Sequence, residues 1–367
     1  MTQREFLKQW MTRVGPAFGL ATVWILFAAL KGADFWTWSN QRLMLLQTAV
    51  VGTAAVGASL VIISGGIDLS VGSAIAVGTM VVALMLKAGI PPVLAAVGGI
   101  GAGCLLGLAT GSMVVGRLWR VAGVVSAACI AAWLWQKATP IGALAIGIGA
   151  GVGFAYLGRR FIGRVELSPF IVTLGMWGAL RGAAKGLGNN QPIYPDQTWL
   201  TSLMQPGNSG LFSILAPGVW IMLALATLMA AVLRYTRFGR HVYAVGSNEL
   251  TARLCGIDVE RTKLVIYCIA AGCAGLAAVL QFAFLYGTGD PTTAMGYELK
   301  VIASVVIGGA SLMGGEGTIQ GTILGALIMT VVDNGCTKLG LANWVQEIVT
   351  GAIIIAAVTL DQLRHRR

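Results

Sequence analysis

Apolar runs of about 20 residues recur along almost the whole chain, and they limit its fold more than any other feature. A helix rises 1.5 Å per residue, so a run of about 20 residues spans the roughly 30 Å of hydrocarbon in a bilayer. Of the 367 residues, 56% are hydrophobic and 11% are charged, whereas soluble domains carry about 25% charged residues. The sequence therefore predicts an all-α polytopic transmembrane helical bundle, built as one domain over residues 1–367.

Hydropathy predicts about 12 membrane spans. They are residues 15–31, 43–63, 69–86, 92–115, 121–137, 140–157, 168–187, 211–233, 264–286, 298–313, 318–336 and 343–360. Many of the 51 glycines lie inside these runs, most densely at 101–111 and 147–153. Because glycine has no side chain, these stretches predict close contacts between neighbouring helices.

The net charge of +11 follows the predicted topology. With a cytoplasmic N-terminus, most of the 25 Lys and Arg lie in segments predicted to be cytoplasmic, including 159–164, 234–263 and the C-terminal tail. This is the positive-inside bias of multi-pass membrane proteins. It predicts cytoplasmic N- and C-termini and contact with membrane lipid, and the positive charge then requires no nucleic acid partner.

Two Gly-rich segments that interrupt apolar runs resemble each other. Residues 63–72 (ISGGIDLSVG) align with residues 306–315 (VIGGASLMGG), and each segment joins two apolar runs on the same predicted side of the membrane. The two halves of the chain therefore look like a parallel structural repeat. Transporters often place solute and gates where such repeats meet and helices are interrupted.

The two interruptions contain candidates for a solute path. In the first, Asp68 and Ser70 could cap the next helix by accepting hydrogen bonds from its free amides. A role in the path is equally compatible, because an acidic residue between two spans is costly unless it is satisfied or hydrated. The second interruption carries Ser311 in place of the acid. The candidate path residues are Ser64, Gly65, Gly66, Asp68, Ser70, Phe170, Thr173, Gly308, Gly309 and Ser311.

The basic connection 234–263 is predicted to contain a helix of about two turns. Ser247 or Asn248 can cap its start, Leu250 and Leu254 share one face, and Gly256 can end it. So short a helix is marginal alone in water. It therefore docks on another protein or rests on the membrane surface, and spacing alone leaves both open.

Four segments resemble the signature segments of the ribose/xylose/galactose-type permeases of bacterial ABC importers. They are residues 64–72, 168–175 (SPFIVTLG), 239–248 (GRHVYAVGSN) and 308–315, which recur in family order across nearly the whole chain. The resemblance implies a bacterial inner membrane (plasma membrane) protein that passes a monosaccharide or related polar solute. It also implies a second permease copy in a homodimer or pair, a cytoplasmic ABC ATPase and a periplasmic solute-binding protein.

On this resemblance, residues 247–256 become the coupling helix received by the ATPase, within the cytoplasmic coupling loop 234–263. The residues expected to carry that coupling are Gly239, Arg240, Gly246, Ser247, Asn248, Glu249, Leu250, Leu254 and Gly256. Family members commonly pass directly from the 107–111 type of segment to the 168–175 type, but here about fifty residues intervene. Residues 117–163 are therefore expected to form an inserted, peripheral helical hairpin beside a family core of ten spans.

Several function classes find no support in the sequence. No GxxxxGK[ST] phosphate loop occurs, so ATP would have to be hydrolysed by a partner. The only histidines are His241 and His365, so no metal-based or His-based catalytic site is expected, and no cofactor. An ABC permease for branched-chain amino acids or nucleosides stays open. A proton-coupled secondary transporter also stays open, although Asp68 and Asp333 are few residues for a proton relay. A channel without energy coupling stays open too.

Arg181 lies within a predicted span, so its charge needs an explanation. It lies about 20 Å along its helix from Ser168, near the predicted outer interface. Snorkelling to that interface is favoured over solute binding. Phe170, Trp177 and Tyr297 could stack on a sugar ring, although packing is the commoner role of such aromatics.

Overall fold

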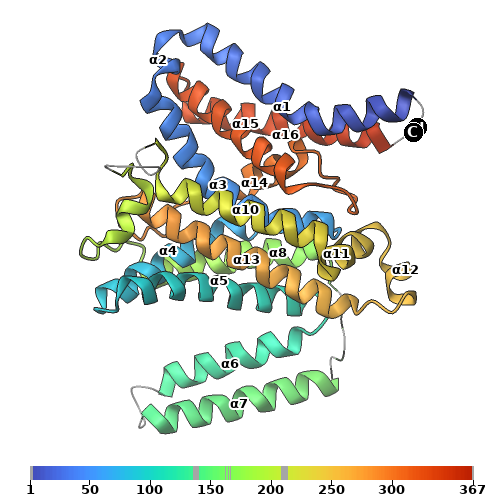
Figure 1. Ribbon diagram of the computed structural model, residues 1–367. Coiled ribbons are helices and arrows are strands. Elements are labelled where there is room, and N and C mark those ends of the chain that lie inside the picture. The colour runs from blue at the N-terminus through green and yellow to red at the C-terminus, as the bar shows by residue number, and fades with distance from the viewer. Residues whose placement is uncertain are drawn as a thin grey trace.

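The computed structural model describes residues 3–134, 140–161, 163, 165, 167–207 and 214–365. These residues form an almost entirely helical protein (Figure 1). The elements are α1 (Gln3–Lys31), α2 (Ala33–Trp36), α3 (Trp38–Ile63), α4 (Val71–Lys87), α5 (Pro92–Val114), α6 (Leu118–Leu134), α7 (Pro140–Phe161), α8 (Pro169–Leu187), the 3₁₀ helix η1 (Trp199–Met204), α10 (Pro217–Tyr235), α11 (Arg237–Ser247), α12 (Glu249–Leu254), α13 (Val259–Phe284), α14 (Tyr297–Ile307), α15 (Ile319–Lys338) and α16 (Asn343–His365).

Five of the described helices, α3, α5, α10, α13 and α15, are long and apolar enough to cross a membrane. Shorter apolar helices are formed by Gly15–Lys31 within α1, by α4, and by Asn343–Thr359 within α16. The expectation of a polytopic helical membrane protein is thus confirmed, whereas the count of about 12 spans stays a prediction. Residues 135–137 and 211–213 of two predicted spans lie outside the described residues.

The predicted span 298–313 is wrong at its C-terminal end. Its helix, α14, has only 11 residues, which is about 16 Å and roughly half of a bilayer core. The helix stops because Gly309 adopts a φ of 92°, and the Gly309 and Ala310 amides donate back to the Val306 and Val305 carbonyls. Hydropathy could not reveal this end, since the residues beyond it are as apolar as those before it.

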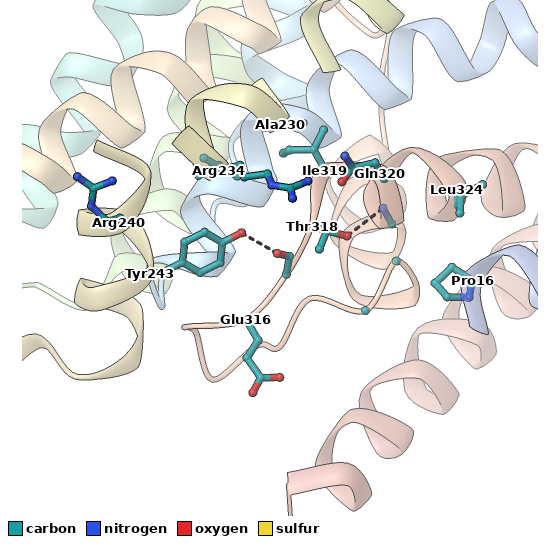
Figure 2. A pocket seen from close by; sticks show the side chains of 15 residues that line it. Pro16, Ala230, Arg234, Arg240, Tyr243, Glu316, Thr318, Ile319, Gln320 and Leu324 are labelled. Carbon is teal, nitrogen blue, oxygen red and sulfur yellow. Dashed lines mark hydrogen bonds between the residues drawn. The ribbon is translucent and has the colours of Figure 1, made fainter. Parts of the chain in front are cut away.

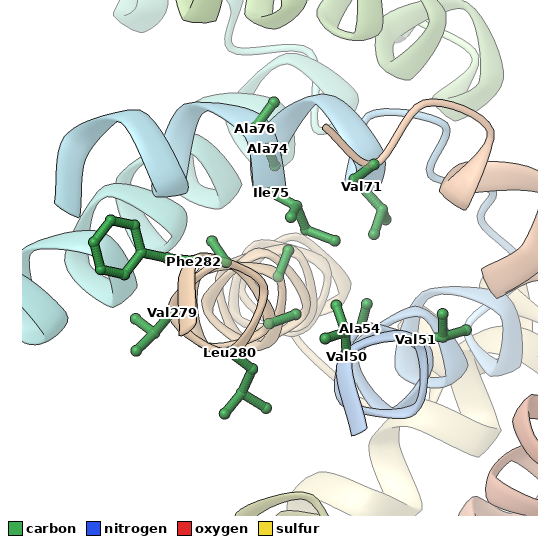
Figure 3. Packing of buried hydrophobic residues seen from close by; sticks show 14 of the residues in the cluster. Val50, Val51, Ala54, Val71, Ala74, Ile75, Ala76, Val279, Leu280 and Phe282 are labelled. Atoms are coloured by element: carbon green, nitrogen blue, oxygen red, sulfur yellow. The ribbon is translucent and has the colours of Figure 1, made fainter. Parts of the chain in front are cut away.

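The centre of the bundle is α3, which is buried along most of its length. Figure 3 shows Val50 and Ala54 on the side of α3 that faces α13, and Ile75 of α4 directed toward the same space. Val51 of α3 and Leu280 of α13 belong to the same buried cluster. Small and branched side chains dominate this cluster, so the three helices approach closely. Burial of residues 48–63 on every face fixes the C-terminal end of α3 against its neighbours.

Glycines bring α5 and α13 into backbone contact, as the dense stretch 101–111 predicts. A Cβ atom added at Gly103 would overlap the Ala271 carbonyl oxygen, and one added at Gly107 would overlap the Tyr267 carbonyl oxygen. Gly101 faces away from this contact, with no atom of the described residues within 4 Å of an added Cβ.

Helices α6 and α7 pack against each other and lie to one side of the other helices (Figure 1). An added Cβ at Gly123 or Gly151 would come within 2.7 Å of the partner helix's backbone. The Val165 amide donates to the Gly116 carbonyl at 3.3 Å, which joins the two ends of the pair. The structure therefore has a helical pair in the described part of 117–163, and its origin as an insertion stays a prediction.

Substituting Gly107 should destabilise the protein. The change Gly107→Leu forces α5 and α13 apart and should cost about 1–3 kcal/mol, seen as a lower apparent melting temperature of the purified protein in detergent. The matched change Gly101→Leu should leave that temperature nearly unchanged. Equal shifts for the two variants would contradict close packing of α5 on α13.

Candidate translocation and coupling site

The connection between α10 and α13 is mostly helical. Thr236 caps α11 by accepting from the Gly239 amide at 3.2 Å, and a side chain at Gly239 would overlap the Leu233 carbonyl group. The 11-residue helix α11 was not predicted. Its buried residues Val242 and Val245, which follow the capping threonine, were the sequence signal for it.

The predicted short helix is confirmed as α12. Asn248 rather than Ser247 caps it, since the Asn248 Oδ1 accepts from the Thr251 amide at 2.9 Å. Leu250 and Leu254 are 75% and 89% exposed, and α12 lies at the edge of the molecule (Figure 1). The helix therefore presents an apolar pair outward.

Glu249 holds α12 against α13. Its carboxylate accepts from Lys263 at 2.6 Å and from Arg253 at 2.9 Å. Partial burial by itself would raise the pKa of Glu249, but the hydrogen bonds from Lys263 and Arg253 outweigh burial and lower that pKa. Glu249 thus stays ionised well into mildly acidic conditions.

Three segments far apart in the sequence meet at four glycines, which we call the glycine junction: Gly65, Gly246, Gly314 and Gly315. The Gly315 amide donates to the Ile63 carbonyl at 2.8 Å. A Cβ at Gly246 would overlap that same carbonyl oxygen, and one at Gly314 would lie 2.6 Å from the Gly246 carbonyl oxygen. The end of α11 therefore touches both helix interruptions directly.

One cavity borders the glycine junction, and a second borders the second interruption. The smaller, about 220 Å³, is lined by Ser64, Gly65, Gly66, Val114, Pro169, Val245, Gly246, Ser247, Asn248, Glu249, Lys263, Tyr267 and Met313. The larger, about 850 Å³ (Figure 2), is lined by Pro16, Ala230, Leu233, Arg234, Arg240, Tyr243, Gly308, Gly309, Glu316, Gly317, Thr318, Ile319, Gln320, Gly321 and Leu324. Figure 2 shows Tyr243 reaching across to the second interruption, where its hydroxyl donates to the Gly317 carbonyl at 2.8 Å.

The two interruptions have equivalent turns, with a register one residue away from the sequence alignment. Gly65 has a φ of 81° and follows the C-cap of α3, and Gly309 has a φ of 92° and follows the C-cap of α14. The alignment paired Gly65 with Gly308. The contact between Gly315 and Ile63 confirms that both interruptions lie on the same side of the bundle.

At the far end of α8, Arg181 is buried, so the expectation that it snorkels is wrong. Its side chain is 9% exposed, and its Nη1 donates to the Pro291 and Thr293 carbonyl oxygens at 3.0 and 2.7 Å. The irregular segment 285–296 between α13 and α14 supplies these carbonyls. Position along the helix gave no sign of this covering segment.

Three further side chains complete what we call the polar cluster of Trp177, Arg181, Gln281 and Glu298. The Trp177 Nε1 donates to the Glu298 Oε1 at 2.8 Å. The Gln281 Nε2 donates to the Thr293 Oγ1 at 2.8 Å. Sequence analysis overlooked Glu298 and Gln281, although an acidic residue in an apolar run was the available signal for Glu298.

Comparison with known proteins identifies the family. Residues 115–358 match the family described as the permease component of the branched-chain amino acid transport system. The chain is 32% identical to the ribose import permease protein RbsC of Escherichia coli, across 99% of this chain and 98% of that protein. It is 31% identical to the D-allose transport system permease protein AlsC of Escherichia coli (96% and 92%) and 30% identical to the fructose import permease protein FrcC of Rhizobium meliloti (95% and 84%).

The chain belongs to this family of ABC transporter permeases. The predicted resemblance to sugar-importer permeases is confirmed. The permease is a multi-pass inner membrane protein, and it is a transport subunit rather than a catalytic enzyme. Within the described residues, no group of three or more His, Cys, Asp or Glu side chains is arranged to hold a metal ion.

The four signature segments of the permease converge in the structure. Three of them, 64–72, 239–248 and 308–315, supply the glycine junction. The fourth reaches the first interruption through Thr173, whose hydroxyl donates to the Ile67 carbonyl at 3.1 Å. Sequence reasoning named these segments separately but did not predict that they touch.

The remaining candidate path residues differ from one another in burial and in hydrogen bonding. Asp68 is buried and accepts from the Ser70 amide and hydroxyl at 2.8 and 2.6 Å. The expected acceptor role thus falls to Asp68, and Ser70 makes no side-chain cap of its own. Phe170 is exposed, whereas Ser311 is buried within its own turn. A path role for each of them stays a prediction.

Removing the Glu249 charge should loosen α12. The change Glu249→Gln weakens the pairs with Lys263 and Arg253, so α12 amides should exchange hydrogen about two to five times faster, as expected for a partly exposed ion pair. Hydrogen exchange followed by mass spectrometry measures this effect. Because the pKa of Glu249 is lowered in the folded state, the wild type should keep the protection at neutral pH and lose it as the pH falls through that lowered pKa.

The matched control is Glu347→Gln on α16, which should leave exchange in α12 unchanged. Wild-type exchange rates in the Glu249→Gln variant would show that the ion pairs do not hold α12.

Proposed function

We propose that the permease is the membrane subunit through which an ABC importer carries a monosaccharide or related polar solute from the periplasm to the cytoplasm. A partner ATPase supplies the energy by hydrolysing ATP. The observation that carries this proposal is the glycine junction, because it ties an exposed cytoplasmic helix to both helix interruptions. Similarity along almost the whole chain to permeases named for ribose, allose and fructose supports the class of solute.

Coupling is proposed to run from α12 to the interruptions. The ATPase receives the exposed Leu250 and Leu254, and closure of its dimer on ATP moves α12 together with α11. Gly246, at the end of α11, is in contact with both the Ile63 carbonyl and Gly315. Movement of α11 therefore displaces the ends of α3 and α14, which opens the path alternately to each side. The solute passes unmodified.

The proposed orientation has both termini in the cytoplasm. The start of α1 and the end of α16 lie on the same side of the molecule as α12 (Figure 1), where the ATPase would bind. The loop residues 188–196 and η1 lie toward the opposite side and would face the periplasmic solute-binding protein. The exposed apolar side chains around the bundle would contact membrane lipid.

Other transport classes have weaker support. The family description names branched-chain amino acids, but the relatives named above carry sugar names, and nothing favours nucleosides. A proton-coupled transporter would need a titratable relay, whereas Asp333 accepts from Lys300 at 2.6 Å and Asp68 is bound by Ser70.

Loss of uptake with a protonophore in ATP-replete vesicles would favour a proton-coupled transporter over an ATP-driven importer.

Charged residues on α12 should uncouple transport. The double change Leu250→Glu and Leu254→Glu places two carboxylates on the proposed ATPase contact, so uptake of labelled sugar should fall at least tenfold and the ATPase should co-purify poorly. Thermal stability should be unchanged, because both leucines are exposed.

The control is Leu341→Glu, a partly exposed leucine after α15, at the opposite end of that helix from the second interruption. It should transport normally. Normal uptake with a normally bound ATPase in the double variant would contradict the proposed contact.

A second permease copy is proposed to pack on α8, in the homodimer that the family resemblance implies. Gly178, Gly182 and Gly186 recur every four residues, and within the described residues no atom lies within 4 Å of an added Cβ at any of them. A GxxxG pattern open to lipid is the usual face for close packing of two membrane helices. The pair would then enclose a path between its subunits.

A bulky residue on this face should prevent pairing. The change Gly182→Leu should convert the detergent-solubilised permease from two copies to one, as measured by light scattering during size-exclusion chromatography, since leucine holds the two α8 helices apart. Gly149→Leu on α7, which is also open, should leave the pair intact. An unaltered pair in the Gly182→Leu variant would exclude α8 as the interface.

A further inference from the structure

The polar cluster at the far end of α8 contains hydrogen-bonding capacity that the protein does not use. The Arg181 Nη2, the Gln281 Oε1 and the Glu298 Oε2 are buried and have no hydrogen-bond partner among the described residues. The three side chains are at most 9% exposed. Buried polar atoms are rarely left unpaired in native proteins, so three in one cluster require an explanation.

The unused atoms belong to side chains that are otherwise fixed. Arg181 is held by two backbone carbonyls of the segment 285–296, and Gln281 is held by Thr293 from the same segment. Glu298 is held through its Oε1 by the Trp177 indole. Each side chain is therefore oriented through one atom and keeps a second atom free, which is the arrangement of a preorganised binding site.

The chemistry of the free atoms matches a neutral polyol. Arg181 offers a donor, whereas Gln281 and Glu298 offer acceptors, and a sugar hydroxyl both donates and accepts. The opposite charges of Arg181 and Glu298 make the site unsuited to an ion of either sign. Trp177 is 39% exposed, so part of its ring is open to stack on the apolar face of a sugar ring.

Close packing against α4 connects the cluster to the first interruption. An added Cβ at Gly72 would overlap the Glu298 Oε2 and would lie 2.5 Å from the Ala294 carbonyl oxygen. The Ser73 hydroxyl donates to the Trp177 carbonyl at 2.8 Å. Since α4 begins directly after the first interruption, a shift of α4 during coupling would uncover or cover the Glu298 Oε2.

We propose that Trp177, Arg181, Gln281 and Glu298 form a binding subsite for a neutral polyhydroxylated solute within the permease, which α4 closes in the present conformation. This inference rests on the proposed sugar-import function. The subsite gives the permease its own contact with the sugar after the binding protein releases it. Hydroxyls of the sugar take up the free hydrogen-bonding atoms, and the sugar ring lies against Trp177.

The first experiment measures uptake by the complete transporter, permease with ATPase and loaded binding protein, in proteoliposomes supplied with D-ribose, D-allose or D-fructose. Glu298→Gln and Arg181→Lys keep the size of the side chains and should lower uptake of the transported sugar at least tenfold, as expected for a lost charge-assisted hydrogen bond. The thermal stability of Glu298→Gln should match the wild type, because the Oε1 acceptor for the Trp177 indole is kept. Glu347→Gln on α16 is the matched control and should transport normally.

The second experiment measures sugar binding to the purified permease by tryptophan fluorescence. The transported sugar should change the emission of the wild type, and Trp177→Phe should abolish that change while leaving the fold intact. A change that persists in Trp177→Phe would contradict stacking at this ring. Emission of the wild type that the transported sugar leaves unaltered would also overturn the subsite.

The outcomes distinguish failure of the proposed function from failure of the subsite alone. A wild-type transporter that imports no monosaccharide, or that imports leucine instead, contradicts the proposed function. A wild-type transporter that imports a sugar, together with Glu298→Gln and Arg181→Lys variants that import it equally well, overturns only the subsite. Reduced uptake accompanied by reduced thermal stability in both variants would assign the cluster a structural role and would also overturn the subsite.

Discussion

Backbone that leaves a helix inside an apolar bundle must find its hydrogen bonds within the protein, and the permease depends on how this constraint is met. At the end of α3 the Ile63 carbonyl, which no longer has a helical partner, accepts from Gly315 in the other interruption. Gly246 packs so closely on the same carbonyl that an added Cβ atom would overlap its oxygen. Since no side chain separates the three segments, none can move far without displacing the others. The end of α11, directly before the six-residue helix α12, is therefore in contact with both interruptions at once.

The two ends of the bundle are connected along one face of α8. Residues 173, 177 and 181 are spaced by four and so share that face. Thr173 bonds to the first interruption, Trp177 to α14, and Arg181 to the segment before α14. The same face thus contacts the first interruption and contributes to the polar cluster. The opposite, glycine-rich face of α8 is open, which leaves it available for a second copy.

Local chemistry predicted local structure well, and its failures have identifiable causes. The cap at Asn248 and the end near Gly256 were predictable because both depend on residues within one turn. The early end of α14 was missed because hydropathy reports composition and ignores the conformation of Gly309. Arg181 was assigned to the interface because its partners, Pro291 and Thr293, lie more than a hundred residues away.

The sequence by itself determined the class of protein, because apolar runs of membrane length, basic residues gathered in alternate connections and four signature segments are local properties of the chain. Tertiary structure alone decided that Gly65, Gly246, Gly314 and Gly315 touch. It also decided that Arg181 and Glu298 are buried with atoms that have no hydrogen-bond partner among the described residues. The physical reason is that glycine carries no side chain whose pattern could reveal its neighbour. A buried charge likewise gives no indication of its partner until the helices are packed.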